Sequence, residues 1–375
     1  MLLRIILTVS VCAFIYKSMI MMCPCSADSQ EQLGAAQTAA ITNAAQSLLA
    51  LLDSTQHAKA LLPYETLESA VPTYFPMPGR PSFNFVGEQY GQSVWSNFPV
   101  SDVLRPGLRL GDLTPKQHGA VMELLRATLS DRGYRKVQEI MGSDQALADE
   151  GVPYAAGRAV YTIAIFGEPS PTNLWMIQFG GHHLALNMAI YQAQSVLSPV
   201  LTGAMPANYM EAGVAKRVLA DENDKAFALF DSFDNDQRAE VSINHPVSDV
   251  VYGPGEDGKI LPAVGLKASM LNQTQQAMLF ELIAEWAGIL NDVHAAPRLQ
   301  EIRTDLQDTF FAWSGPSTHE PGRNGASYFR IQGPNLLIEF SPQFPGGDLT
   351  NHVHTIYRDP LRSYGRTLAR EYELL

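Results

Sequence analysis

Two stretches of this chain carry the same helix start, and their repetition limits the folds that the sequence can adopt. Residues 113–125 read LTPKQHGAVMELL and residues 271–283 read LNQTQQAMLFELI, an ungapped offset of 271 − 113 = 158. Identical residues occupy four aligned positions: Leu113/Leu271, Gln117/Gln275, Glu123/Glu281 and Leu124/Leu282. Thr114 and Asn272 are good N-caps, and a glutamine three residues later completes a capping box in each stretch. The chain is therefore predicted to contain two related helices.

The similarity continues into the apolar segments downstream of each helix. Residues 173–179 (NLWMIQF) resemble residues 335–340 (NLLIEF) with a one-residue gap, and a histidine-bearing segment follows each of them, GGHHLALN and NHVHTIYR. A third capped start at residues 233–241 (FDNDQRAEV) leaves open that the helix match is ordinary capping chemistry. The ordered series favours an α+β fold with pseudo-duplicated halves, at about 110–190 and 270–360, within a single globular domain of residues 28–375.

Other segments fit the same fold class. Residues 31–53 are alanine-rich with leucines at helical spacing, which predicts a helical N-terminal segment. Seven prolines between residues 54 and 112 predict irregular structure. Short apolar runs over 159–191 predict an antiparallel meander. Helices are expected near residues 212–232, 235–241 and 273–291, and the chain is expected to close with strands and a short helical tail.

The N-terminus has the features of an export signal. Arg4 is followed by the apolar run 5–16, and small residues at Cys25 and Ala27 make residues 1–27 a cleavable signal peptide. Lys17 interrupts the apolar stretch and argues against a membrane span, although an uncleaved anchor is the alternative. All three cysteines precede the cut, so catalysis in the secreted protein would use histidines, carboxylates, hydroxyls or a metal.

Charge and motifs exclude several classes of function. The net charge is −12, and cleavage would remove Arg4 and Lys17 to give −12 − 2 = −14, whereas nucleic-acid binding requires a basic surface. The sequence contains no G-x-S-x-G, H-E-x-x-H, Walker or dinucleotide-binding motif. We therefore expect no nucleic-acid partner, and no membrane association after signal cleavage.

Four histidines are the first candidates for a metal site. His352 and His354 alternate along a predicted strand, so both imidazoles would project from one face, as ligands for Zn, Cu or Fe. His182 and His183 are adjacent and would face opposite ways, with His183 as the ligand and His182 as a ligand or a core residue beside it. Gly180 and Gly181 would permit a bulge that aims both rings into one site. The alternatives are a surface pair at 352/354 and a core histidine at 182.

Polar residues on the neighbouring predicted strands extend the candidate site. Glu339 would be a fourth ligand or a general base, because a buried carboxylate needs a partner. Gln178 and Asn187 would support the ligands through hydrogen bonds. Arg330 and Arg358 would orient an anionic group of a small-molecule substrate, or would pair with Glu339 and Asp359.

The motifs FGGHHLALN, YFRIQGPNLLIEF and NHVHTIYRDPLRSYG resemble those of a mostly secreted family that is catalogued only as a domain of unknown function. The capped LTPKQ helix and the loop PVLTGAMP (199–206) are also similar, and the resemblance covers about residues 35–370. It implies one fold unit and export, and no established reaction. Where family members often have two tryptophans before the histidine pair, this chain has Trp175 alone.

The sequence thus favours a secreted metal-dependent enzyme. Hydrolysis by a metal-activated water is the first expectation, since it needs no organic cofactor. A copper or iron oxidoreductase is next, because histidine-rich sites also accept those metals. The alternative from another class is a non-catalytic, extracytoplasmic protein that binds a metal or another ligand.

Overall fold

The computed structural model describes residues 27–80, 82–152 and 155–371. The predicted signal peptide and the three cysteines lie outside this part of the chain, apart from Ala27, which begins the first helix. Among the described residues, no helix is both long enough and apolar enough to span a membrane.

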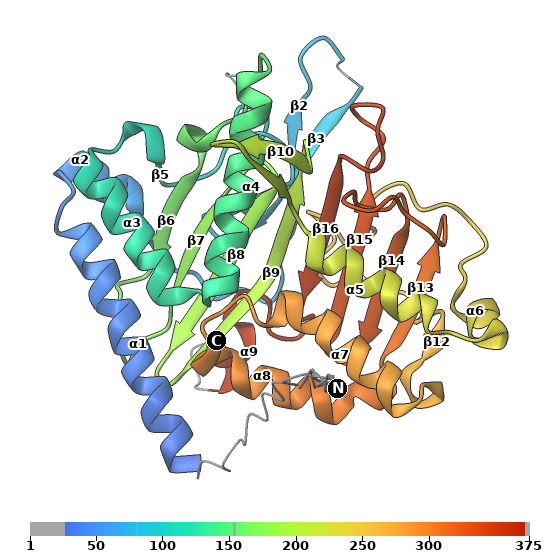
Figure 1. Ribbon diagram of the computed structural model, residues 1–375. Coiled ribbons are helices and arrows are strands. Elements are labelled where there is room, and N and C mark those ends of the chain that lie inside the picture. Colours follow the sequence, from blue (N-terminus) through green and yellow to red (C-terminus); the bar gives the residue numbers. More distant parts are fainter. Residues whose placement is uncertain (1–26, 81, 153–154, 372–375) are drawn as a thin grey trace, which may run out of the picture.

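A large, mostly antiparallel sheet organises the molecule (Figure 1). Its strand order is β1-β6-β7-β8-β9-β16-β15-β14-β13-β12, where β1 is the short strand Leu61–Leu62, and β5 adds to β6. From one edge to the centre the strands follow in chain order up to β9, and from the centre to the other edge they follow in reverse order from β16 to β12. At the centre, β9 and β16 pair antiparallel. The α+β class and the pseudo-duplicated halves predicted from sequence are therefore confirmed.

The two repeats contain the same elements in the same order, and they extend further than the sequence match indicated. The first repeat, blue to green in Figure 1, consists of α1 (Ala27–Leu49), α2 (Ser54–Ala60), β5 (Leu108–Arg109), α3 (Pro115–Thr128), α4 (Asp131–Asp149), β6 (Thr162–Phe166), β7 (Trp175–Gly181), β8 (Leu184–Tyr191) and β9 (Gln194–Ala204). The second, yellow to red, consists of α5 (Ala220–Asp231), α6 (Asn235–Val241), β12 (Leu266–Lys267), α7 (Gln273–Ala287), α8 (Asp292–Asp305), β13 (Phe310–Ser314), β14 (Tyr328–Gly333), β15 (Leu336–Pro342) and β16 (Val353–Arg358).

Hydrogen bonds at the helix starts show how closely the repeats correspond. The capping glutamine of α3, Gln117, donates through Nε2 to Leu51 O at 2.9 Å and to Gln56 Oε1 at 2.7 Å. Its counterpart Gln275 on α7 donates to Ser232 O and to Gln237 Oε1, both at 2.9 Å. The third capped start, FDNDQRAEV, is therefore the equivalent of the start of α2, where Asp53 caps Gln56.

The strand equivalence drawn from sequence is wrong by one strand. NLWMIQF leads into β7, whose counterpart in the strand order is β14, whereas NLLIEF leads into β15, the counterpart of β8. The two histidine segments therefore do not occupy equivalent points of the repeats. Gln178 does not match Glu339; it pairs with Asn187 across β7 and β8, as Arg330 pairs with Glu339 across β14 and β15.

Two further local predictions need correction. Residues 54–112 are not wholly irregular, since they include α2 and a small antiparallel sheet of β2 (Val71–Pro76), β3 (Asn84–Tyr90) and β4 (Ser93–Trp95). The helix expected near residues 212–232 begins only at Ala220, because β10 (Asn208–Glu211) and β11 (Val214–Arg217) form a hairpin before it. The sheet β2–β4 and the hairpin β10–β11 lie outside the duplicated elements, whereas α2 belongs to the first repeat.

The two faces of the large sheet are covered differently. Helices of both repeats cover one face, where they enclose the main hydrophobic core with the apolar side chains of the strands (Figure 1). Against the other face pack β2–β4, the segment around Tyr252 and the C-terminal residues around Tyr364, which form a smaller core. Gln178, Asn187 and Glu339 are buried on this second side, beside β4 or the segment around Tyr252.

Candidate metal centre

His182 and His183 are the two residues that connect β7 to β8. They were predicted to lie within a strand and to face opposite ways, but β7 ends at Gly181 and β8 begins at Leu184. A two-residue hairpin requires a positive φ, and His183 supplies it with φ 59°. As a result the two rings stack, with centroids 3.7 Å apart and an interplanar angle of 25°.

His183 meets His352 and His354 across the central strands. His183 Nε2 lies 3.1 Å from His352 Nε2, which lies 3.2 Å from His354 Nε2. The three residues are 2%, 7% and 6% exposed, and they form one of two described groups whose nitrogen or carboxylate atoms are close enough to hold a metal ion. The structure thus brings together three of the histidines singled out from sequence.

Two of these imidazoles have their protonation fixed by an outer partner. His352 Nδ1 lies 2.8 Å from Pro345 O, which can only accept, so Nδ1 carries the hydrogen. His354 Nδ1 donates in the same way to Asp249 Oδ1 at 3.0 Å. In the neutral rings both Nε2 atoms then present lone pairs toward each other. Such a contact is repulsive unless a cation lies between the nitrogens, and outer partners of this kind are usual for metal-binding histidines.

The electrostatic surroundings favour the neutral forms of His183 and His352. Burial lowers the pKa of His183 well below its usual value, and the neighbouring histidines lower it further. Burial and the proximity of His354 lower the pKa of His352 to about 4. Burial alone would raise the pKa of Asp249, but the hydrogen bond and charge of His354, among other bonds, hold it below its usual value. Neutral imidazoles beside an ionised carboxylate are the forms that bind a divalent cation.

Gly203 makes room for the cluster. It pairs with His354 in the register of β9 and β16. A Cβ atom at Gly203 would lie 2.6 Å from Val353 O and 3.3 Å from Cδ2 of His183, so a larger residue would displace backbone. The glycine therefore allows the β7–β8 hairpin to reach β16.

His182 adds a second pair to the site. Its Nδ1 lies 2.7 Å from Asp144 Oδ1 on α4, and Asp144 Oδ2 accepts from Gly157 N at 2.9 Å. Asp144, His182 and His183 are the other described group with metal-ligand geometry. Because Asp144 is buried and doubly bonded, it orients the ring of His182, whose side chain is 11% exposed.

Glu339 lies on β15 with other partners. Its Oε1 accepts from Val251 N at 3.0 Å and from Tyr328 Oη at 2.5 Å, and its Oε2 accepts from Tyr252 N at 2.8 Å. Burial raises the pKa of Glu339, and these hydrogen bonds oppose the rise. The carboxylate belongs to neither of the described metal-ligand groups. In this structure it attaches the segment around Tyr252 to the sheet.

The two arginines are also engaged away from the histidines. Arg358 forms a bidentate pair with Glu88, at 2.9 and 2.7 Å, and donates to Tyr252 O and Gly253 O. Arg330 faces Glu339 across β14 and β15, and its Nε is buried with no hydrogen-bond partner. The side chain of Arg358 thus connects the sheet to its covering loops.

Gln178 and Asn187 bond to each other, with Gln178 Nε2 donating to Asn187 Oδ1 at 2.7 Å. Gln178 Nε2 also donates to Ser93 Oγ, and Asn187 Nδ2 donates to Pro199 O. None of these partners is one of the four histidines, so the support predicted for the ligands comes instead from Asp144, Asp249 and Pro345 O. No sequence pattern marks Asp144 or Asp249, because they lie 38 and 105 residues from their histidines along the chain and meet them only in the fold.

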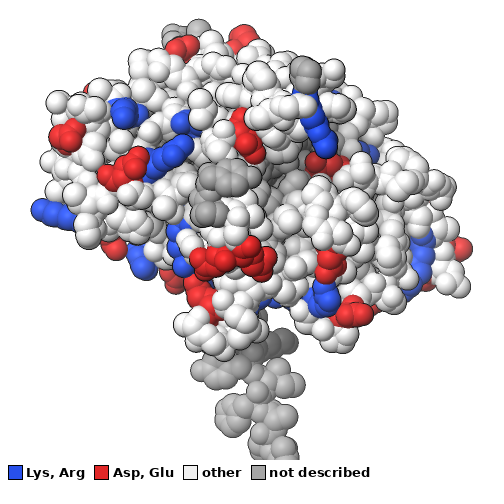
Figure 2. Space-filling view, turned by 90° about the horizontal axis from the view of Figure 1, so that it is seen from above, with Lys and Arg blue, Asp and Glu red and all other residues white. Residues whose placement is uncertain are grey.

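The shape and charge around the site limit what it can accept. A cavity of about 150 Å³ adjoins His352. Residues of α4, of the segment after β9 and of the loop before β16 line it: Leu147, Glu150, Pro206, Pro345, Asp348 and Asn351. On the face seen in Figure 2, acidic and basic side chains are interspersed rather than gathered into one basic surface.

A family model described as a protein of unknown function (DUF3500) matches residues 80–366, most of the chain. The chain belongs to the DUF3500 family. A search of curated proteins and a search of solved structures found no match. The predicted resemblance to a family of unknown function is therefore confirmed.

Proposed function

We propose that this DUF3500 protein holds one divalent transition metal through Nε2 of His183, His352 and His354, and that it is an exported metal-dependent hydrolase. The observation that carries the proposal is the convergence of three buried imidazole nitrogens at 3.1 and 3.2 Å, two of them with Nδ1 hydrogens already donated outward.

The nitrogen spacing is appropriate for such an ion. Ligands at 2.0–2.1 Å from a tetrahedral ion lie about 3.3 Å apart, and about 2.9 Å apart when adjacent on an octahedral ion. The Nε2–Nε2 distances of 3.1 and 3.2 Å in this structure fall between these values. Three protein ligands leave a coordination position open, which is the arrangement of catalytic rather than structural zinc sites. Zinc is the first candidate, with copper and iron next.

His182 and Asp144 would supply the proton chemistry. A bound metal lowers the pKa of its water, and this is the only chemistry that the proposal asks of it. With the Nδ1 hydrogen of His182 donated to Asp144, Nε2 of the same ring is free to accept a proton. The stacking of His182 on His183 holds that ring beside the ligands.

The substrate would enter through the cavity beside His352. Its lining includes Glu150 and Asp348, so it favours an uncharged or cationic group. The sequence suggested instead an anion held by Arg330 and Arg358, but the bidentate pair with Glu88 already occupies Arg358. We therefore propose a small, uncharged substrate for hydrolysis.

Metal analysis tests the site. The purified protein, stripped with chelator and incubated with Zn, Cu or Fe, should retain about one ion per chain, and His352→Ala/His354→Ala should retain none. Asp249→Asn should weaken binding about 10- to 100-fold, because it removes the carboxylate that orients His354. His245→Ala, which changes an exposed histidine, is the matched control. A parent protein without stoichiometric metal, or a double variant that binds as well as the parent, would refute the proposal.

Turnover distinguishes the hydrolase from its alternatives. The metal-loaded protein should hydrolyse members of a panel of uncharged chromogenic amides and phosphate triesters, and chelation should abolish this activity. Oxygen consumption by a copper- or iron-loaded protein would indicate the oxidoreductase, and stoichiometric metal without turnover would indicate a binding protein. Export is tested separately by the intact mass of the protein secreted from its host, which should correspond to cleavage after Ala27.

A further inference from the structure

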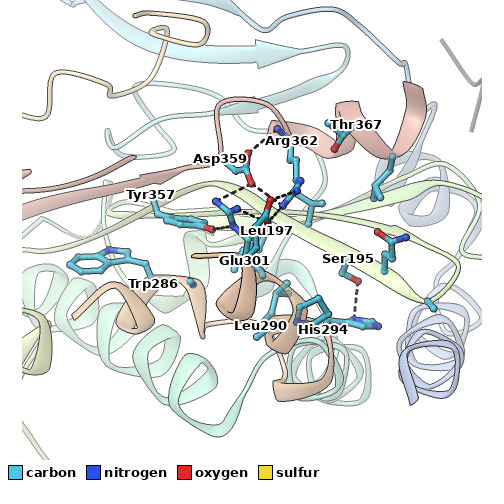
Figure 3. A pocket seen from close by; sticks show the side chains of 18 residues that line it. Ser195, Leu197, Trp286, Leu290, His294, Glu301, Tyr357, Asp359, Arg362 and Thr367 are labelled. Atoms are coloured by element: carbon cyan, nitrogen blue, oxygen red, sulfur yellow. Dashed lines mark hydrogen bonds and ion pairs between the residues drawn. The ribbon is translucent and has the colours of Figure 1, made fainter. Parts of the chain in front are cut away.

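A large cavity lies at the opposite end of β9 from the histidine cluster. Its volume is about 470 Å³, and it is bounded by the start of β9, by α8 and by the C-terminal residues 357–368 (Figure 3). Ser195 and Gly203 are 203 − 195 = 8 residues apart on one strand, which is about 26 Å at 3.3 Å per residue. The cavity is therefore separate from the candidate metal centre.

A serine and a histidine in this cavity form a hydrogen-bonded pair of defined direction. Ser195 Oγ lies 2.9 Å from His294 Nδ1, and His294 Nε2 lies 3.2 Å from Gly34 O on α1. A carbonyl oxygen only accepts, so in the neutral ring Nε2 carries the hydrogen and Nδ1 carries the lone pair. The hydroxyl of Ser195 must then donate to His294 Nδ1. This is the arrangement of a nucleophile, its base and a third group that orients the base.

His294 of this pair is buried, whereas Ser195 is accessible from the cavity. His294 is 4% exposed, in the first turn of α8, where its backbone N–H donates to the N-cap Asn291 at 3.1 Å. Ser195 is partly exposed and lines the cavity. No G-x-S-x-G motif surrounds Ser195, which lies near the start of a strand rather than in a sharp strand–helix turn, so sequence motifs did not indicate it.

The remaining walls indicate the class of molecule that fits. Arg362 donates twice to Glu301, at 2.5 and 2.6 Å, and Arg298 lies 2.9 Å from Glu301 and 3.1 Å from Asp359. These two cations and two anions neutralise one another, so the cavity has no unpaired charge to offer an ionic ligand. Apolar side chains supply most of the other surface: Leu197, Trp286, Leu290, Pro297 and Leu368. Figure 3 shows Ser195 and His294 on one side of the ionic network and Trp286 on the other.

We propose that this cavity is a second reaction site, in which Ser195 attacks uncharged esters of apolar carboxylic acids with His294 as the base. Ser195 Oγ bonds to the carbonyl carbon while its proton passes to His294 Nδ1. The bond from that carbon to the alcohol oxygen breaks, and the alcohol leaves with the proton. Water then cleaves the acyl-serine through the same nitrogen, which releases the carboxylic acid and restores Ser195.

Covalent labelling tests this proposal without depending on the metal site. The full-length protein is treated with diisopropyl fluorophosphate, and the adduct is located by mass spectrometry of peptides. We expect one adduct, on Ser195, formed equally in chelator and in His352→Ala/His354→Ala. Ser195→Ala should not be labelled, and Ser101→Ala, which removes an exposed serine without a histidine partner, should be labelled like the parent.

The base is tested by His294→Gln, which should slow labelling by about 10²-fold or more, since general-base assistance is typically worth 10²–10⁴. Hydrolysis of p-nitrophenyl butyrate should survive chelation and fall at least tenfold in Ser195→Ala. Unchanged metal binding by Ser195→Ala would show that its fold is intact. Absence of an adduct on Ser195 of the parent, or equal ester hydrolysis by Ser195→Ala, would overturn the proposal whatever the outcome at the metal centre.

Discussion

His294 is buried as a neutral imidazole, and that state has a consequence for acid stability. Burial lowers its pKa, and the hydrogen bond to Gly34 O opposes the decrease only in part. The folded protein therefore binds a proton at His294 less readily than the unfolded chain, in which the pKa is about 6.5. As the pH falls through about 6.5 the unfolded state gains protons that the folded state does not, so the free energy of unfolding falls.

His294→Gln should remove this contribution. We expect the free energy of unfolding of the metal-free parent to fall between pH 7.5 and 5.5, and the fall to be smaller in the variant by at most about 1.4 kcal/mol per pH unit. Urea denaturation in chelator at several pH values measures both. His183 and His352 titrate in the same direction, but they are present in both proteins and cancel in the comparison. Parallel pH profiles would show that His294 does not titrate as described.

The residue scale also separates what a sequence can indicate from what it cannot. The spacing of His352 and His354 indicates a shared strand face, because alternation is a local property of a strand. The same alternation rule was wrong for His182 and His183, because they lie in the turn between β7 and β8 and not within a strand. Asp144 and Asp249 were not found at all, because contacts across 38 and 105 residues leave no local pattern.

At the scale of elements, the capping glutamines connect consecutive helices within each repeat. Gln117 and Gln275 complete the capping boxes of α3 and α7 and also bond to a backbone carbonyl and a glutamine of the preceding helical segment. Both side chains are buried, so their removal leaves a carbonyl without its partner as well as a weaker cap. Such losses typically cost about 1–3 kcal/mol.

We therefore predict that Gln117→Ala and Gln275→Ala each lower the free energy of unfolding by about 1–3 kcal/mol, by similar amounts. Gln273→Ala, at the exposed first residue of α7, should change it by less than about 0.5 kcal/mol. Urea denaturation followed by circular dichroism gives the three values. If either buried variant matched Gln273→Ala, the bonds between helices would not contribute as the structure indicates.

Elements differ in how well a sequence identifies them. The caps at Thr114 and Asn272 were predicted correctly because capping uses a few residue types at fixed spacing. The strands were matched one position out of order, because β7, β8, β14 and β15 are all short buried apolar runs and differ only in their neighbours. The sheet order resolves them, and it also shows that the duplication includes α1 and α2, whose sequences resemble α5 and α6 only at the cap.

At the scale of the whole molecule, the two repeats share one sheet and one main hydrophobic core. β9 and β16 pair at the middle of one sheet, and the main hydrophobic core contains residues of both repeats without interruption. The connection between α3 and α4 also contacts the connection between α7 and α8. Ser130 N donates to Ile289 O and Asn291 N donates to Thr128 O, each at 3.0 Å. The candidate metal centre is itself composite, since His183 belongs to the first repeat and His352 and His354 adjoin or belong to the last strand of the second. Neither repeat alone contains the complete cluster.

This sharing predicts that the repeats unfold together. Scanning calorimetry should show a single transition, and Gln117→Ala in one repeat and Gln275→Ala in the other should each lower its midpoint by about 1–4 °C without splitting it. Because the two glutamines share no partners, the double variant should show the sum of the two free-energy changes within about 0.5 kcal/mol. Two separate transitions, each moved by only one substitution, would mean that the repeats fold as independent units and that the shared sheet does not couple them.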